Sequence, residues 1–272
     1  MRFASWNVNN RSLRQSHVDF LQNLRLDVLA LQEVSLGFHG ALVDSGLFAW
    51  GRTSLTLRPT EAGETAARKL GCSVFGSGGL RPDITTVLSG VAFPERTLMV
   101  NAQSAAGVVL LCSFHIPPGA SWKEIKPQTM CAIADRLAKL PGTAIVGMDA
   151  NAPKQDHPEH CDNVWWWPDE PKLLGHEPGH HLRDALRTYL ARHPGELEDI
   201  RQARPYGPLA LSHRRGVGKT RTDCRYDFIL CTPDVEVAGV QYLYEESVAA
   251  GSDHALVVAE LELHANETTS IR

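Results

Sequence analysis

Short apolar segments that end beside an acidic, amide or histidine residue recur along the chain, and they constrain its fold more than any other feature. Asp27 to Leu31 and Thr143 to Met148 are largely apolar runs, typical of strands buried on both faces. The first leads to Glu33, and Asp149 follows the second directly. In layered α/β folds, loops at strand ends converge over a rigid sheet, so these polar residues predict one shared site.

Other segments extend the same alternation of strands and helices. Strands are predicted at residues 2–6, 97–103, 107–115, 225–231 and 254–263, and helices from Ser12 or Ser16 to Leu24, at 122–140 and at 182–192. Residues 52–90 give no clear assignment, and residues 152–180 form an insertion rich in Pro, Trp and His. Because no linker divides the chain, we expect one domain over residues 1–264 and a frayed tail over 265–272.

Size and charge exclude some classes of function. The chain has 272 residues, which is enough to bury a large core, so a metal is not needed merely to hold the fold together. Its 27 basic and 31 acidic residues give a net charge of 27 − 31 = −4. A protein that coats nucleic acid is normally basic, so binding to a phosphate chain requires a local basic patch here.

The chain carries no sequence signal for export or membrane insertion. No window approaches the roughly 20 apolar residues of a membrane span, and the first residues lack the pattern of a signal peptide. The six cysteines have no paired spacing, and several lie in apolar runs where a free thiol behaves as a small hydrophobe. We therefore expect reduced thiols and a cytoplasmic location, although the spacing leaves disulfides open.

Six short motifs occur in a fixed order over residues 2–260. They are Ser5-Trp6-Asn7-Val8-Asn9, Leu31-Gln32-Glu33-Val34, Ser113-Phe114-His115-Ile116-Pro117, Gly147-Met148-Asp149-Ala150-Asn151, Arg225-Tyr226-Asp227-Phe228-Ile229-Leu230 and Gly251-Ser252-Asp253-His254-Ala255. Each motif alone is common, but the ordered set resembles the endonuclease/exonuclease/phosphatase family, which includes DNase I-like nucleases. This resemblance implies a four-layer α/β sandwich, in which two mixed β-sheets pack together between helices.

Oxygen-bearing side chains in these motifs suit a divalent cation. Glu33, with Asn7 and Asp253, supplies the hard oxygen ligands that Mg²⁺ or Mn²⁺ prefers, and the resemblance places the metal chiefly at Glu33. Asp253 is either a metal ligand or a second orienting acid, and Asn7 is also a candidate substrate-binding residue. The alternative for Glu33 alone is a surface carboxylate at a strand end. Asp149 and Asn151 have the spacing to face one pocket, where the carboxylate orients or deprotonates water and the amide of Asn151 donates to a phosphate oxygen. Their alternative is a self-capping Asp-Ala-Asn turn.

Two histidines complete the predicted catalytic set. The resemblance pairs His254 with Asp227, and a carboxylate on one ring nitrogen fixes the tautomer and makes the imidazole a better base or phosphate stabiliser. The alternative is a buried ion pair. His115 is positioned to protonate the leaving oxygen or bind the phosphate, unless it is simply a core histidine. The resemblance implies a histidine there in DNase I-like and sphingomyelinase branches and tyrosine in abasic-site endonucleases.

Two further segments bear on the substrate. The loop from Ser212 to Arg221 contains Arg214 and Arg215, which either contact phosphates beside the scissile one or lie in a solvated turn. The tryptophans of residues 165–167 are able to stack on a base or enter a lipid interface, but we expect them to pack the insertion against the domain.

These patterns favour a divalent-metal-dependent phosphodiesterase, most consistent with a nuclease that hydrolyses DNA or RNA. A phosphodiester is anionic and resists attack, so the enzyme must neutralise its oxygens, activate water and stabilise the leaving alkoxide. The alternative keeps this chemistry but acts on a phospholipid, an inositol phosphate or a small nucleotide. A binding module that lost its activity is disfavoured because every expected position is filled.

Overall fold

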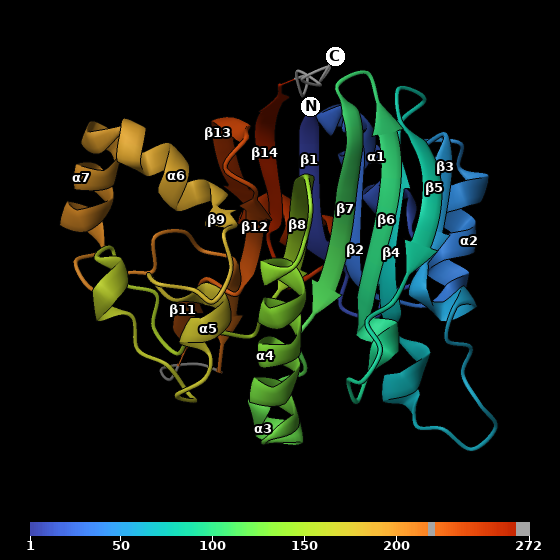
Figure 1. The fold of residues 1–272 in the computed structure, drawn as a ribbon, viewed down its shortest axis with the longest axis horizontal. Coiled ribbons are helices and arrows are strands. Elements are labelled where there is room, and N and C mark those ends of the chain that lie inside the picture. Colours follow the sequence, from blue (N-terminus) through green and yellow to red (C-terminus); the bar gives the residue numbers. More distant parts are fainter. Residues whose placement is uncertain (217–220, 265–272) are drawn as a thin grey trace, which may run out of the picture.

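The computed structural model describes residues 1–216 and 221–264, and two six-stranded mixed sheets pack face to face in it (Figure 1). The first sheet has the order β13 (Val235–Leu243), β14 (Leu256–Leu263), β1 (Arg2–Asn7), β2 (Val28–Val34), β4 (Gly71–Gly76) and β3 (Trp50–Thr53). The second has the order β5 (Arg81–Thr86), β6 (Thr97–Ser104), β7 (Gly107–His115), β8 (Thr143–Asp149), β12 (Asp227–Cys231) and β9 (Arg183–Asp184). A separate ribbon pairs β10 (His213–Arg215) with β11 (Thr222–Cys224).

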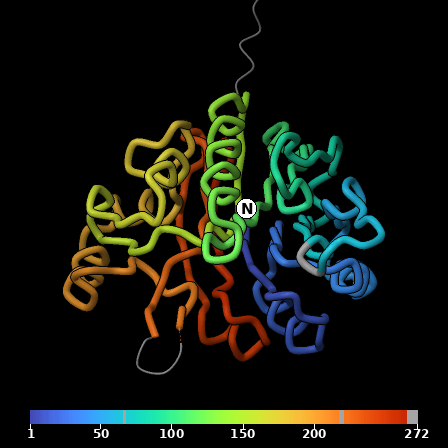
Figure 2. Tube along the Cα trace, turned by 90° about the horizontal axis from the view of Figure 1, so that it is seen from below, coloured from blue at the N-terminus to red at the C-terminus, as the bar shows by residue number. Residues whose placement is uncertain are grey.

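Helices cover the outer faces of both sheets. They are α1 (Gln15–Leu24), α2 (Leu36–Asp44), α3 (Gly119–Trp122), α4 (Ile125–Ala138), α5 (Pro171–Leu174), α6 (Ala185–Arg192), α7 (Pro194–Ala203) and α8 (Tyr244–Ala250). Leu21 of α1 and Phe38 of α2 pack on the first sheet, and Met130 of α4 packs on the second. Figure 2 shows α4 and α1 on opposite sides of the molecule. The predicted four-layer α/β sandwich is confirmed.

The two sheets approach each other closely where β8 crosses β1 and β2. A Cβ at Gly147 would lie 2.8 Å from Ser5 Oγ and 3.0 Å from the Cβ of Ala30, so only glycine fits there. Beside this contact, Gln32 Nε2 donates to Ser113 Oγ at 3.0 Å and links the first sheet to the second. The Gly147 contact and the Gln32–Ser113 hydrogen bond both lie near the strand ends. They therefore fix the two sheets relative to each other where the predicted site residues lie.

Several predicted elements differ from the observed ones at their ends. The helix expected at 122–140 is observed as α4, which begins only at Ile125, because Lys123 has a φ of 38° and ends the short α3 just before it. The helix expected at 182–192 is observed as α6, and Pro194 begins α7 directly after it, since proline fits the first turn of a helix. β13 and α8 were not predicted, and β13 is an edge strand with a bulge between Val237 and Gly239.

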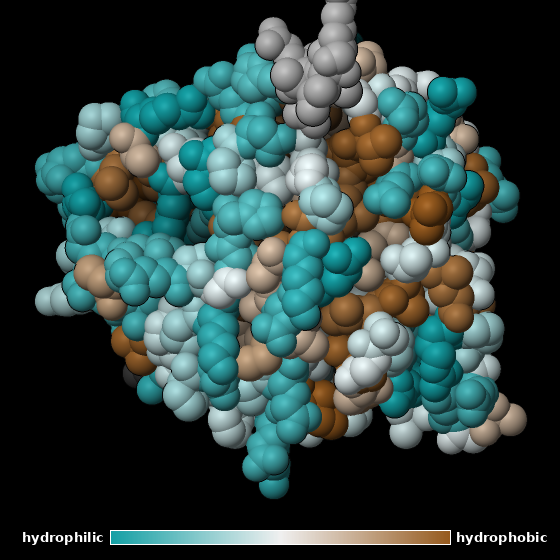
Figure 3. Space-filling model, viewed as in Figure 1, coloured by the Kyte–Doolittle hydropathy of each residue, from teal (hydrophilic) through white to brown (hydrophobic). Residues whose placement is uncertain are grey.

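The face seen in Figure 3 is mostly polar, with apolar areas beside α4. Ile84 of β5 and Val108 of β7 are among the exposed large hydrophobic residues. All six cysteines are unpaired, and in the described part of the chain no helix is long and apolar enough to cross a membrane. The expected tail at 265–272 and residues 217–220 of the basic loop lie outside the described residues.

Candidate active site

Three polar side chains form a row across the second sheet. His115 at the end of β7 is the register partner of Asp149 at the end of β8, and Asp149 is in turn the partner of Asp227 on β12. All three side chains are buried. Because β7 and β8 run parallel, both strands deliver their last residue to the same edge, at the lower end of the sheet in Figure 1.

The first sheet delivers two more predicted residues to this edge. Asn7 ends β1, and its Nδ2 donates to Asp149 Oδ2 at 2.8 Å. Glu33 Oε1 lies 3.5 Å from His115 Nε2, and Asp149 Oδ2 lies 3.7 Å from the same nitrogen. Carboxylates from two different sheets therefore converge on one histidine.

Glu33 reaches this position through an unusual backbone. Its φ is 56°, in the left-handed region that glycine normally occupies, and the pairing of β2 with β4 shifts register between Leu31 and Val34. A bulge of this kind re-aims a side chain next to a site. A left-handed conformation at a non-glycine residue is strained, and such residues cluster at functional sites.

His254 and Asp227 form the predicted pair. His254 Nδ1 lies 2.9 Å from Asp227 Oδ2, and both side chains are buried. Burial lowers the pKa of His254, but the nearby carboxylates, Asp227 foremost and then Asp149, raise it to about 10. The ring therefore carries a positive charge at neutral pH and donates to Asp227.

The surroundings of Asp149 disfavour its charged form, whereas those of His254 favour its charged form. Burial raises the pKa of this carboxyl to about 7, although His254 and the hydrogen bonds from Asn151 and Asn7 act to lower it. The Asp149 carboxylate is thus buried with less compensation than its charge requires. A group that changes charge near neutral pH is suited to accept a proton from water.

Asn151 lies at the mouth of the site. Its φ is 49°, its amide N–H donates to Asp149 Oδ1 at 3.0 Å, and its side chain donates to the carbonyl of Ile116 at 2.9 Å. The predicted Asp149–Asn151 spacing therefore gives both a local turn and a shared pocket wall. The predicted alternative, a self-capping turn, is present, and the catalytic role of the pair stays a prediction.

Two residues of the site were missed by the sequence analysis. The Arg96 side chain is buried, and its Nη1 lies 3.4 Å from His115 Nδ1. Burial lowers the pKa of His115 well below its usual value, and Arg96 and His254 lower it further, so this ring is neutral. His213 stacks on His254 with ring centroids 4.4 Å apart and an interplanar angle of 24°. No motif marked Arg96, and His213 lies in the basic loop of residues 212–221, where the sequence analysis considered only the arginines.

Other predicted residues lie at the margin. Asp253 is exposed, and its carboxylate clusters with His213 and His254 within 4.8 Å rather than with Glu33. Arg214 pairs with Asp223 at 3.2 Å, whereas the Arg215 guanidinium lies 4.8 Å from the ring centre of Trp166. The assignments of Asp253 to the metal and of Arg214 to the substrate stay predictions.

The donor set fits a hard divalent cation on the Glu33 side of the site. Glu33 Oε1 and Asp149 Oδ2 each lie within 3.7 Å of His115 Nε2, and a cation held by these carboxylates would compensate the buried charge of Asp149. The Asp149–Asp227–His254 cluster is less suitable, although its ligand atoms lie within 4.8 Å of one another, because a protonated imidazole does not bind metal. The geometry thus separates an oxygen-rich side from an acid–base side.

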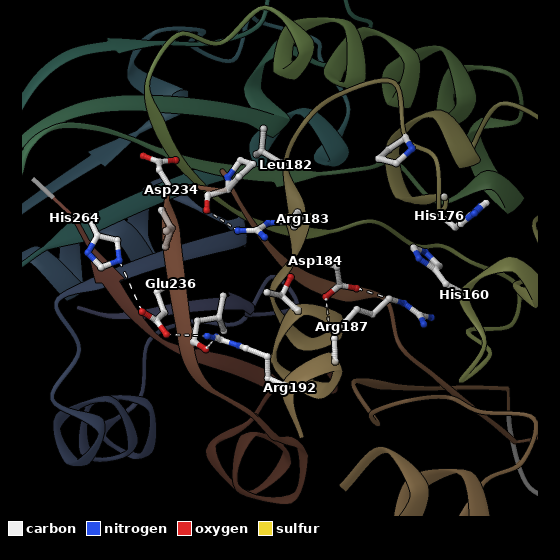
Figure 4. A pocket seen from close by; sticks show the side chains of 17 residues that line it. His160, His176, Leu182, Arg183, Asp184, Arg187, Arg192, Asp234, Glu236 and His264 are labelled. Atoms are coloured by element: carbon white, nitrogen blue, oxygen red, sulfur yellow. Dashed lines mark hydrogen bonds and ion pairs between the residues drawn. The ribbon is translucent and has the colours of Figure 1, made fainter. Parts of the chain in front are cut away.

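A cavity of about 760 Å³ lies away from the predicted site residues, beside α6 and β13 (Figure 4). Its arginines are already engaged: Arg187 binds Asp156 at 2.6 Å, Arg192 binds Glu236 at 2.8 Å, and Arg183 donates to a backbone carbonyl. None of the predicted site residues lines it. Its size alone therefore does not make it the functional site.

Three of the solved structures with the same fold illustrate the likeness. D. rerio TDP2 complexed with a single-strand DNA product has a TM-score of 0.69 at 12% identity, covering 96% of this chain and 98% of that one. An AP endonuclease from Archaeoglobus fulgidus has 0.64 at 19% identity, covering 97% and 100%. The human Nocturnin catalytic domain with bound sulfate has 0.60 at 16% identity, covering 96% and 94%. At these identities the likeness shows the fold alone.

Sequence comparison gives the family directly. No curated protein sequence matches the chain. The model of the Endonuclease/Exonuclease/phosphatase family matches residues 4–254, which is most of the chain and contains five of the six motifs in full and the sixth as far as His254. The chain therefore belongs to the Endonuclease/Exonuclease/phosphatase family.

Proposed function

We propose that this protein is a divalent-cation-dependent phosphodiesterase that hydrolyses phosphodiester bonds of DNA or RNA. One observation carries the proposal: Glu33 and Asp149 from two sheets converge on His115, beside a His254 that Asp227 keeps charged. This arrangement offers an oxygen-rich cation site and a separate acid–base pair within one buried cluster. Hydrolysis of an anionic ester requires both.

The cation side is assigned to Glu33, with Asn7 as a further oxygen donor and Mg²⁺ or Mn²⁺ as the ion. A bound cation of this type neutralises phosphate oxygens and the developing charge on the leaving oxygen. Asn7 already orients the site, because its Nδ2 holds Asp149 at 2.8 Å. Asp253 is a further candidate ligand from the resemblance, but its carboxylate clusters with His213 and His254, so we do not assign it to the cation beside Glu33.

The remaining roles follow from charge and hydrogen bonding. Asp149, with its pKa raised by burial to about 7, takes the proton of the attacking water. The charged His254 stabilises a phosphate oxygen, and Asp227 holds its ring in place. His115 Nε2 is buried without a hydrogen-bond partner among the described residues, so it can donate to the leaving oxygen. Asn151 positions the substrate phosphate.

Nucleic acid is favoured as substrate by two considerations. The solved structures of the same fold include one with a single-strand DNA product and one of an AP endonuclease, as stated in their descriptions. In this chain, Arg215 and Lys154 lie near an exposed tryptophan beside Asn151, which gives the local positive charge that a phosphate chain requires. The net charge of −4 requires such a local patch.

The proposal is tested by cleavage of labelled single-stranded DNA, duplex DNA and RNA with Mg²⁺, Mn²⁺ or EDTA. Asp149→Ala and His254→Ala are compared with Asp83→Ala and His181→Ala, which change the same residue types at exposed positions. We expect cation-dependent cleavage that falls on the order of 10²-fold or more only in the first two variants.

Two other outcomes are informative. Turnover of bis-p-nitrophenyl phosphate without cleavage of any nucleic acid would move the substrate to a lipid or a small phosphate ester. Cleavage that survives in EDTA, or that falls equally in all four variants, contradicts the assigned site.

A further inference from the structure

A second cavity lies directly beside the catalytic edge. Its volume of about 480 Å³ falls in the range of roughly 300–1,000 Å³ typical of small-molecule sites. Aromatic, basic and amide side chains line it together, chiefly Asn151, Trp166, Trp167, His213, Arg215 and Tyr226. The lining is therefore not simply apolar, because aromatic rings and the positive charge of Arg215 face the same space.

The cavity shares its inner wall with the predicted catalytic residues. Asn151 Nδ2 lies 3.3 Å from Asp149 Oδ2, and the His213 ring stacks on His254 at 4.4 Å. His213 also stacks on Tyr226, with ring centroids 5.8 Å apart and an interplanar angle of 23°. A row of parallel rings therefore leads from His254 into the cavity. A group bound there would be attached close to the reacting phosphate.

The three consecutive tryptophans have different environments. Trp165 packs against the hydrophobic core under α4, as we expected for the whole cluster. Trp166 does not: it is 40% exposed and lines the cavity. Arg215 lies 4.8 Å and Lys154 lies 5.3 Å from its ring centre. Packing of the insertion thus explains Trp165 but leaves Trp166 facing solvent between two positive charges.

A buried ion pair holds this wall in place. Lys126 Nζ lies 2.5 Å from Glu170 Oε1 and donates to the carbonyl of Asn151 at 2.8 Å. The other carboxylate oxygen of Glu170 accepts from the backbone N–H of Trp166 at 2.9 Å. Both charged side chains are fully buried. The network ties Trp166 to Asn151, so the cavity wall and the catalytic edge are one rigid unit.

We propose that this cavity binds one unstacked nucleobase of a single-stranded nucleic acid, next to the phosphate that is cleaved. A base offers a flat ring to Trp166 and Tyr226, and the phosphates on either side offer negative charge to Arg215 and Lys154. A base inside a duplex is stacked and paired, so it must leave the helix to enter. The inference rests on the proposed function and deepens it, because it predicts a preference for single strands.

The test combines a protein change with a matching substrate change. Wild type, Trp166→Ala and Val164→Ala are assayed on a single-stranded oligonucleotide and on copies in which one nucleotide beside the cleavage point lacks its base. Val164 is the matched control, since it lies in the same insertion with the same 40% exposure but does not line the cavity. Circular dichroism melting checks that each variant is folded.

Loss of the tryptophan should matter only when the base is present. We expect Trp166→Ala to lower kcat/KM on the intact strand roughly 5- to 100-fold, as for other base-stacking residues, and to leave it nearly unchanged on one of the base-free copies. Val164→Ala should match wild type on every strand. An equal loss on intact and base-free strands, or no loss on either, overturns the inference.

A binding measurement separates this inference from the proposed function. Fluorescence anisotropy of the same labelled strands, with Asp149→Ala protein, reports affinity without cleavage. If wild type cuts no nucleic acid, the proposed function fails, and the anisotropy still decides the cavity. Weaker binding of a base-free strand that disappears in Asp149→Ala/Trp166→Ala supports a base site, whereas equal affinities for all strands contradict it.

Discussion

Two buried clusters of charge lie at different places on the second sheet, and they are built on opposite principles. In the first, Arg225, two residues before β12, binds both carboxylate oxygens of Asp184 at 2.6 Å, and Arg187 binds Asp156 at 2.6 Å. The buried Asp156 and the half-buried Asp184 there each face a guanidinium. In the candidate catalytic cluster, the buried Asp149 lies beside Asp227, and His254 is the cation that both share.

The two aspartates Asp184 and Asp149 show the consequence. Burial raises the pKa of Asp184, but Arg225 and Arg187 more than offset this and leave it lowered. Burial raises the pKa of Asp149 to about 7, because the surrounding positive charge does not compensate it. The Arg225 cluster is complete within the chain and contributes to stability. The candidate catalytic cluster contains His254 and Arg96 but too little positive charge to offset the burial of Asp149, which suits the cation site proposed above.

The largest predicted effect separates activity from stability. Asp149→Ala should reduce kcat/KM on the order of 10²- to 10⁴-fold, because it removes the proposed base. Since the raised pKa makes ionised Asp149 unfavourable in the folded state, its loss should lower the free energy of unfolding at pH 8 in EDTA by no more than about 1 kcal/mol. Cleavage assays and urea unfolding measure the two quantities. A large loss of stability would contradict the comparison.

The reverse pattern is expected in the other cluster. Arg225→Met removes a buried guanidinium and leaves the half-buried Asp184 and the buried Asp156 without this partner, so the free energy of unfolding should fall by about 3–5 kcal/mol. Activity per folded molecule, assayed at low temperature, should fall far less than in Asp149→Ala. Arg225→Lys keeps the charge and should lose less stability. If Arg225→Met unfolds no more readily than wild type, the cluster is not the stabilising one.

The pH dependence of stability tests the His254–Asp227 pair. The pKa of His254 is raised in the folded state to about 10 from 6.5, so its stabilisation is complete below pH 6.5 and is lost as the pH rises through 10. The free energy of unfolding of wild type should be about 1.5–3 kcal/mol higher than that of Asp227→Asn at pH 6. This difference in stability should shrink as the pH rises toward 10. Urea unfolding at several pH values measures it. If the stability difference between wild type and Asp227→Asn grows as the pH rises, the predicted His254–Asp227 interaction is contradicted.

The smallest predicted effect concerns the cation. In wild type, Mg²⁺ at ten times its Kd should raise the free energy of unfolding by about 1.4 kcal/mol, because it binds only the folded state. Glu33→Gln should remove most of this gain at the same Mg²⁺ concentration. Asp253→Asn should keep it, since Asp253 lies with His213 and His254. Thermal melts with Mg²⁺ and with EDTA give the values, and equal losses in both variants would place Asp253 at the ion.

Much of the fold was predictable because its signals are local. Continuous apolar runs marked β2, β7 and β8, and the predicted bounds of β7 agree with the structure. β13 was missed because an edge strand with one exposed face has a mixed pattern, and its bulge interrupts even that. The split between α3 and α4 depends on a left-handed Lys123, which no propensity predicts.

The sequence alone determined which polar residues follow the buried strands and the family to which their order belongs, because both are properties of neighbours along the chain. The tertiary structure decided the rest. It turned Glu33 inward through a left-handed residue at a bulge, placed Arg96 against His115, and set Trp166 beside Asn151 through Lys126 and Glu170. These contacts join residues far apart in the chain, and they form only when two sheets and an insertion pack together.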